Sequence, residues 1–133
     1  MKKFVLLCIC FLPASIAWAH APTDISLSYD MGHKNLHVEA HHQSFNLQKM
    51  YIRLMNVYVN GKLISTSNFF RQDAYDKFSD DVALPAKVGD VIKVELFCAL
   101  GGVNAKELKV TSQGVSQTQQ EQDNSTADST GGE

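Results

Sequence analysis

The sequence predicts an all-β protein, an immunoglobulin-like β-sandwich of about seven strands with Greek-key connections. Apolar and polar residues alternate in short stretches across the central part of the chain, which is typical of strands that bury one face. Glycine, proline, asparagine and aspartate separate these stretches at short intervals, as turn residues do. Because no long stretch repeats apolar residues at a helical period, we expect two packed sheets.

The first expected strands form a hairpin. Residues 24–29 alternate polar and apolar side chains, and residues 36–41 do the same after a turn over Asp30–Asn35. The segment His42–Lys49 lacks this alternation, so we expect it to be a loop.

A second hairpin follows this loop. Tyr51–Val59 is the most apolar of the expected strands, and Asn60-Gly61 after it is the strongest turn signal in the chain. We therefore expect a returning strand over Lys62–Ser67. The next segment, Asn68–Lys77, fits either a loop or one short strand.

Three further strands complete the expected sandwich. Phe78–Leu84 alternates and stops before a turn at Pro85–Asp90. Val91–Leu100 is the next expected strand, and Glu107–Thr111 is the last.

The first 19 residues, Met1–Ala19, are typical of a signal peptide. Lys2 and Lys3 precede the apolar run Phe4–Leu12, and Ala17-Trp18-Ala19 has the small residues that signal peptidase recognises. We therefore expect a periplasmic or secreted protein in an oxidising compartment.

The rest of the chain divides into a domain over His20–Val110 and a polar tail over residues 111–133, which we expect to be disordered. No later segment approaches about 20 consecutive apolar residues, so we expect no membrane contact after signal cleavage. Removal of the signal changes the formal net charge from −2 to −4, which offers no basic patch for nucleic acid. The sequence also lacks a Gly-x-Ser-x-Gly elbow and a phosphate-binding glycine loop.

Strand parity brings two metal-ligand residue types to the ends of core-facing rows. Residues two apart in a strand share a face, so His42 continues the inward row of residues 36, 38 and 40. Cys98, the one cysteine after the signal, likewise continues the inward row of residues 92, 94 and 96. Imidazole and thiolate together suit iron, copper or zinc. The alternative is a buried cysteine and a half-exposed histidine that do not touch. A shared ion requires Cys98 Sγ and a His42 ring nitrogen within about 4 Å.

Two more residues are candidate ligands. Met50 shares its phase with Ile52, and its thioether is either a soft ligand or core filler. Met55 lies on the opposite phase, so both sets face inward only if a bulge near Met55-Asn56 resets the register. His20 would carry both an amine and an imidazole after signal cleavage, which favours copper, unless the terminus is frayed.

Several of these residues also resemble a known family when they are taken in order. The matching segments are His20-Ala21-Pro22, His42, Tyr51-Ile52, Val57–Lys62, Val88-Gly89-Asp90 and Glu95–Cys98. As an ordered set they resemble the iron-binding domain of desulfoferrodoxins and superoxide reductases, in particular its small exported relatives. The resemblance implies an immunoglobulin-like sandwich with a mononuclear iron at one end and an oxidoreductase activity of the superoxide reductase type.

The resemblance also implies a ligand set. In that family four histidines and an axial cysteine hold the iron. His20 and His42 match the first two histidines, and Cys98 matches the cysteine. Met50 stands at the position of the third histidine and Gly101 at that of the fourth. A softer set of this kind suits copper as well as iron.

Two hypotheses from different classes follow. The first is an exported, mononuclear metal-binding domain with iron or alternatively copper at His20, His42, Met50 and Cys98, redox-active or a metal carrier. The second is a non-catalytic immunoglobulin-like scaffold with a decayed metal site, which binds another exported protein. The expected partners are thus a metal ion and an exported redox or structural protein.

Overall fold

The computed structural model describes residues 20–112, so the predicted signal peptide and nearly all of the predicted tail lie outside the described residues. The described chain folds into seven strands. Their bounds are β1 (Thr23–Asp30), β2 (Asn35–His41), β3 (Ile52–Val59), β4 (Lys62–Asn68), β5 (Lys77–Ala83), β6 (Val91–Cys98) and β7 (Val103–Lys109). Within residues 20–112 we find no helix long and apolar enough to cross a membrane.

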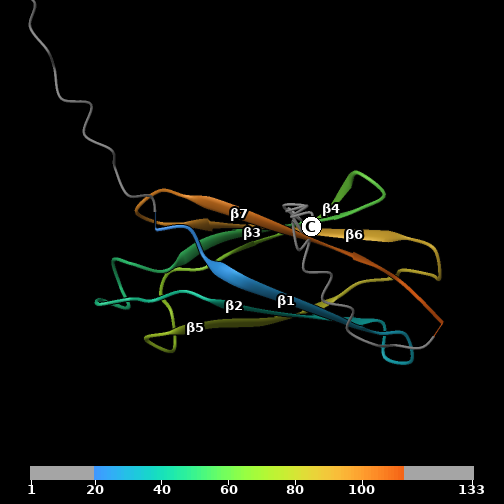
Figure 1. Ribbon diagram of the computed structural model, residues 1–133, viewed down its shortest axis with the longest axis horizontal. Coiled ribbons are helices and arrows are strands. Elements are labelled where there is room, and N and C mark those ends of the chain that lie inside the picture. Colours follow the sequence, from blue (N-terminus) through green and yellow to red (C-terminus); the bar gives the residue numbers. More distant parts are fainter. Residues whose placement is uncertain (1–19, 113–133) are drawn as a thin grey trace, which may run out of the picture.

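The strands form two antiparallel sheets that pack face to face (Figure 1). One sheet has the order β1-β2-β5 and the other has the order β4-β3-β6-β7. The chain crosses between sheets after β2, after β4 and after β5, so that β5 returns to β2 and β6 to β3. This pattern confirms the predicted immunoglobulin-like sandwich with Greek-key connections.

Alternating side chains from both sheets fill the core. The inward row of β2 is at most 2% exposed and ends at His42, while that of β6 ends at Cys98. The core cluster consists of Ile25, Leu27, Tyr29, Leu36, Val38, Ala40, Ile52, Met55, Val57, Phe78, Val82, Leu84, Ile92, Val94, Leu96, Leu108 and Val110. The predicted parity of the rows that end at His42 and Cys98 is therefore confirmed.

A β-bulge resets the register of β3, but it does not lie near Met55-Asn56 as the sequence suggested. Ile52 pairs with Cys98 and Leu54 pairs with Phe97, so β3 has one extra residue at this point. The bulge turns both Ile52 and Met55 inward, at 1% and 0% exposure. The bulge lies beside Cys98, so it also determines which β3 residue, Ile52, pairs with the last residue of β6.

Most strand boundaries differ from the predicted ones by one or two residues, and those around the turn after Cys98 have a clear physical reason. β6 ends at Cys98 instead of Leu100, because the Gly101 N–H donates to the Cys98 carbonyl in a turn, at 3.1 Å. Gly101 and Gly102 both have a positive φ, which glycine adopts without strain. β7 then begins at Val103, earlier than the predicted Glu107, and the ambiguous segment after Asn68 is a loop.

Tyr29 joins β1 to the segment that follows β5. Its hydroxyl donates to the Leu84 carbonyl at 2.5 Å and accepts from the Ala86 N–H at 2.9 Å. The bond with the Leu84 carbonyl is buried and the bond with the Ala86 N–H is partly buried, so water is a poor substitute for the hydroxyl at Leu84.

We expect Tyr29→Phe to lower the free energy of unfolding by about 1–3 kcal/mol, since it leaves the buried Leu84 carbonyl without this donor. Chemical denaturation measures the loss. Tyr75→Phe is the control, because the Tyr75 side chain is 64% exposed, and its effect should stay within about 0.5 kcal/mol. Equal effects of the two substitutions would show that the hydroxyl contributes nothing.

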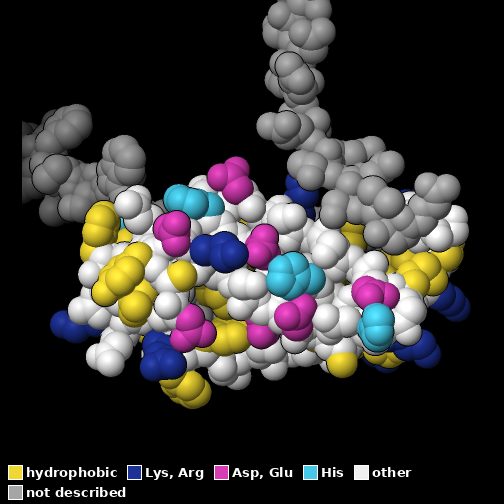
Figure 2. Space-filling view, turned by 90° about the horizontal axis from the view of Figure 1, so that it is seen from below, with side chains coloured by type: hydrophobic (Ala, Val, Ile, Leu, Met, Phe, Trp, Pro, Cys, Tyr) yellow, Lys and Arg dark blue, Asp and Glu magenta, His cyan; other side chains and the backbone are white. Residues whose placement is uncertain are grey.

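The outer face of the β1-β2-β5 sheet carries histidines paired with carboxylates, and Figure 2 shows both side-chain types along it. His37 Nδ1 lies 2.9 Å from Asp81 Oδ1, and Lys77 Nζ lies 3.1 Å from Glu39 Oε1. The hydrogen bond with Asp81 holds the pKa of His37 above its ordinary value, and the same bond lowers the pKa of Asp81. The folded state therefore favours the charged form of both groups.

This pair predicts a pH-dependent contribution to stability. Because the folded pKa of His37 is raised, the contribution is complete below the unfolded value of about 6.5 and is lost as the pH rises through the folded pKa. On the acid side it is lost as the pH falls through the lowered pKa of Asp81. His37→Ala should cost a few tenths of a kcal/mol near about pH 5.5 and nothing near about pH 8, since the side chain is 40% exposed. Denaturation at both pH values measures this, with Asp81→Asn as the partner variant; a loss independent of pH would contradict it.

Candidate metal centre

His42 and Cys98 meet at one end of the sandwich. His42 directly follows β2 and Cys98 ends β6, so the pair links the two sheets. His42 Nε2 lies 3.3 Å from Cys98 Sγ, and each residue is 2% exposed. This distance is within the limit of about 4 Å that was expected for two residues that share an ion. The role of His42 and Cys98 as ligands stays a prediction.

Gln72, which no sequence pattern indicates as a site residue, fixes the orientation of the His42 ring. Its Nε2 donates to the His42 carbonyl at 2.9 Å and to the Ala74 carbonyl at 2.7 Å. Both amide hydrogens are thereby engaged, so Oε1 is the atom that faces His42 Nδ1 at 2.7 Å, and it accepts a hydrogen bond there. The proton of the neutral imidazole is thus deduced to be on Nδ1. Nε2 then directs its lone pair at Cys98 Sγ, which is the form that binds a metal.

Backbone hydrogen bonds between two loops place Gln72 beside His42. The His42 N–H donates to the Asp76 carbonyl at 3.0 Å, and the Gln72 N–H donates to the Leu47 carbonyl at 3.0 Å. The loop after β4 therefore lies against the loop after β2. Gln72 is only 3% exposed, although its polar neighbours in sequence gave no pattern that distinguishes it from a surface residue.

Met50 is buried near the same end. It is 6% exposed and its N–H donates to the Asn46 carbonyl at 2.8 Å. The carbonyl of the next residue, Tyr51, accepts from the Ala99 N–H at 2.9 Å, so Met50 adjoins a residue that is bonded to the turn after Cys98. Met50 and Cys98 are both buried but neither belongs to the core cluster. The role of Met50 as a ligand stays a prediction.

The start of the described chain lies against the turn that follows Cys98. A Cβ at Gly102 would lie 2.7 Å from the Ala21 nitrogen and 3.1 Å from the His20 carbonyl carbon. Asn104 Nδ2 donates to the Pro22 carbonyl at 2.9 Å, and Cys98 N–H donates to the Gly102 carbonyl at 3.0 Å. The His20 backbone is thereby held beside the pair, while its side chain is exposed.

The donor set fits a metal ion in part. Among residues 20–112, no group of three or more His, Cys, Asp or Glu side chains lies close enough to hold an ion, so the structure brings together two of the predicted ligands. A metal–sulfur bond of ~2.3 Å and a metal–nitrogen bond of ~2.05 Å that enclose an angle of ~100° place sulfur and nitrogen ~3.3 Å apart. His42 Nε2 and Cys98 Sγ have this separation, so one ion can bind both with little movement.

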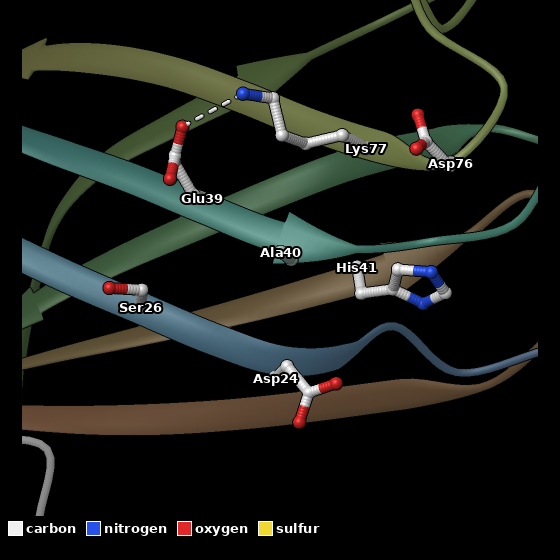
Figure 3. Close-up of a pocket in the computed structure, with 7 residues that line it drawn as sticks. All are labelled: Asp24, Ser26, Glu39, Ala40, His41, Asp76 and Lys77. Atoms are coloured by element: carbon white, nitrogen blue, oxygen red, sulfur yellow. Dashed lines mark hydrogen bonds and ion pairs between the residues drawn. The ribbon is translucent and has the colours of Figure 1, made fainter.

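A pocket on the outer face has neither member of this pair in its lining, and Figure 3 shows the residues that line it. It is shallow, about 190 Å³, and is lined by Asp24, Ser26, Glu39, Ala40, His41, Asp76 and Lys77. His41 and His42 are adjacent in sequence and therefore point to opposite faces. Figure 3 shows the Lys77–Glu39 ion pair at this pocket, between β5 and β2.

Comparisons with known proteins give two distant likenesses of fold. Solved structures of OgpA from Akkermansia muciniphila, in two crystal forms, match 65% of this chain at 14% and 15% identity, each with a TM-score of 0.40. The match covers only 25–27% of OgpA. A superoxide reductase from Nanoarchaeum equitans matches 68% of this chain and 93% of its own, at 18% identity and a TM-score of 0.39. No family model and no curated protein matches the sequence.

Proposed function

We propose that this protein is an exported domain that binds one transition-metal ion through Cys98 Sγ and His42 Nε2. The observation that carries the proposal is the 3.3 Å approach of these two atoms in a site from which water is nearly excluded. Gln72 supports it, because a metal-binding histidine characteristically donates its other ring N–H to a fixed acceptor.

Met50 and His20 are the proposed additional ligands. Met50 is buried at the same end of the sandwich, and the His20 backbone is held at the turn after Cys98. The family resemblance favours iron, while thiolate and thioether donors make copper the alternative. Either metal would supply one-electron redox chemistry when bound. Because Met50 and Gly101 stand at two histidine positions of the resemblance, the proposal is metal binding and does not include superoxide reduction.

The proposal is tested by measuring the metal content of the protein after it has been exported, cleaved and purified. We expect close to one iron or copper ion per chain, and a higher melting temperature with the metal than after chelation. His42→Ala should lose the metal. His41→Ala, a substitution of the neighbouring histidine on the opposite face, should retain it. A metal-free protein that neither iron nor copper stabilises would refute the proposal.

The hydrogen-bond network of the pair favours a second candidate function, that of a scaffold. Within the described residues the Gln72 amide, the His42 ring and the Cys98 sulfur already form a continuous chain of contacts without an ion. An immunoglobulin-like module that binds another exported protein would use this chain only to join its two sheets. Its melting temperature would be indifferent to chelators, which distinguishes it from the metal-binding domain.

A further inference from the structure

We propose that three loops at one end of the sandwich bind the surface of a lipid bilayer through exposed aromatic side chains. The loops are residues 42–51 after β2, residues 69–76 after β4 and residues 99–102 after β6. The inference goes beyond metal binding and does not depend on it. It replaces the sequence-based expectation of no membrane contact, which rested only on the lack of a spanning segment. Side chains that enter the bilayer surface from loops need no such segment.

The four most exposed large hydrophobic side chains of residues 20–112 all lie on these loops. They are Phe70, Phe45, Tyr75 and Leu100, at 83%, 77%, 64% and 59% exposure. Figure 2 shows hydrophobic side chains gathered at this end of the molecule, on the left of the view. An exposed apolar group of this kind marks a surface that binds a membrane or another molecule. Aromatic and leucine side chains are the residues that enter the interface of a bilayer.

Backbone hydrogen bonds hold the two aromatic loops side by side. The Ser44 N–H donates to the Tyr75 carbonyl at 2.6 Å, and the Gln72 N–H donates to the Leu47 carbonyl at 3.0 Å. Phe45 directly follows Ser44, so rings from both loops can face a single surface. Rings on separate loops can enter a fluid interface without a matching shape, whereas a protein partner needs a complementary surface.

The three loops carry no net charge. Lys49 and Arg71 balance Asp73 and Asp76, and Arg71 Nη2 lies 3.5 Å from Asp73 Oδ1. The aromatic side chains can therefore enter a bilayer without an uncompensated charge beside them, which would be costly to remove from water.

The acidic part of the chain follows the opposite end of the sandwich. β7 leads away from the three loops, since Val103 pairs with Phe97 and Lys109 pairs with Val91. Residues 113–133 come after it and contain four acidic residues and no lysine or arginine; the four are Glu121, Asp123, Asp128 and Glu133. Membrane surfaces are commonly negative and repel acidic groups, so this charge distribution favours an orientation with the aromatic loops toward the bilayer.

The point where the chain enters the domain favours a bilayer over a protein partner. A Cβ at Gly102, in the third loop, would lie 2.7 Å from the Ala21 nitrogen, so the domain begins at the aromatic end. Residues 13–19 alone separate His20 from the apolar run Phe4–Leu12 of the predicted signal peptide, and such a segment spans at most about 25 Å. While the signal peptide is in the membrane, the aromatic end is therefore the end of a folded domain that lies nearest the bilayer.

A tryptophan reporter tests insertion directly. The chain has one tryptophan, Trp18, and cleavage after Ala19 removes it. Phe45→Trp therefore gives the processed protein a single reporter. Phosphatidylcholine vesicles should shift its emission to shorter wavelengths, and brominated lipids should quench it. Val88→Trp is the control, because Val88 is 53% exposed in the turn before β6, at the opposite end, and should show neither change.

Sedimentation with the same vesicles measures the contribution of the aromatic side chains. Burial of one such side chain is worth about tenfold or more in affinity. The variant Phe45→Ser/Phe70→Ser/Tyr75→Ser should therefore bind at least about 100-fold more weakly than the unsubstituted protein. Added salt, or vesicles that contain anionic phosphatidylglycerol, should change the affinity of the unsubstituted protein by less than about threefold, because the loops carry no net charge.

The matched control is Leu63→Ser/Ile64→Ser/Val88→Ser, which removes three exposed apolar side chains outside the loops and should retain vesicle binding. Circular dichroism confirms that both triple variants are folded. Cys98→Ser should bind vesicles like the unsubstituted protein, which separates this inference from the proposed metal site.

Three results would overturn the inference. The first is an unsubstituted protein that binds no vesicles at any lipid concentration, including a case in which the loops bind another exported protein instead. The second is an equal loss of binding in the two triple variants. The third is a reporter at position 45 whose emission does not change with vesicles.

Discussion

Replacing Cys98 with serine should remove nearly all of the bound metal while leaving the sandwich folded. A serine hydroxyl stays protonated at neutral pH and is a poor ligand, whereas the thiolate is the soft, charged donor of the pair. Loss of a hydrogen-bond partner of a ligand lowers metal affinity by about 10–100-fold, and loss of the ligand itself should lower the metal affinity by more than that. The metal-free variant should lose no more than about 1–2 kcal/mol in stability, because a hydroxyl at this position can still bond His42 Nε2.

Cobalt(II) titration gives this prediction a direct readout. A thiolate bound to cobalt absorbs in the near ultraviolet by charge transfer, so the band should be present in the unsubstituted protein and absent in Cys98→Ser. Leu100→Ser is the matched control, because Leu100 belongs to the following turn but is 59% exposed. Should the band and the metal content survive in Cys98→Ser, the sulfur is not a ligand.

Two substitutions of Gln72 should separate stability from metal affinity. Gln72→Leu removes the acceptor of the His42 Nδ1–H and the donor to two carbonyls, His42 and Ala74. It should lower the free energy of unfolding by about 2–4 kcal/mol, since buried polar groups lose their partners. It should also weaken metal binding by about 10–100-fold, because the ring is no longer held.

Gln72→Glu keeps an oxygen opposite Nδ1 but places an acceptor against the two carbonyls. We expect it to be destabilised like Gln72→Leu, yet to retain metal affinity within about threefold of the unsubstituted protein, because the ring nitrogen keeps its acceptor. Denaturation and metal titration of both variants measure the two effects. If affinity falls equally in both variants, Gln72 acts only by holding the loop and not through His42 Nδ1.

The fold and half of the candidate site follow from local patterns in the sequence. Alternation predicted the rows that end at His42 and Cys98, because strand parity depends only on neighbouring residues. β4 was predicted from the Asn60-Gly61 turn, since its own side chains bury nothing. β7 was predicted to start late because its first residues are all exposed and show no alternation.

Other features depend on contacts between segments distant in sequence. Gln72 reaches His42 because backbone hydrogen bonds join its loop to Leu47, and a local sequence pattern cannot predict a bond between such distant segments. The bulge of β3 lies at Ile52–Leu54, where the ladder with β6 shifts by one residue, and alternation alone did not locate it. The positions of His20 and Met50 relative to the pair likewise depend on turns whose course the sequence does not specify.

The contact between Ala21 and Gly102 has a practical consequence for every measurement of metal content. A histidine affinity tag fused ahead of His20 would emerge beside Cys98, where its imidazoles could supply ligands of their own. β7 leads away from this end, since Val103 pairs with Phe97 and Lys109 pairs with Val91. A tag joined directly after Ser112 would therefore follow a strand that ends at the far side of the sandwich, and it is the suitable choice for assays of native metal.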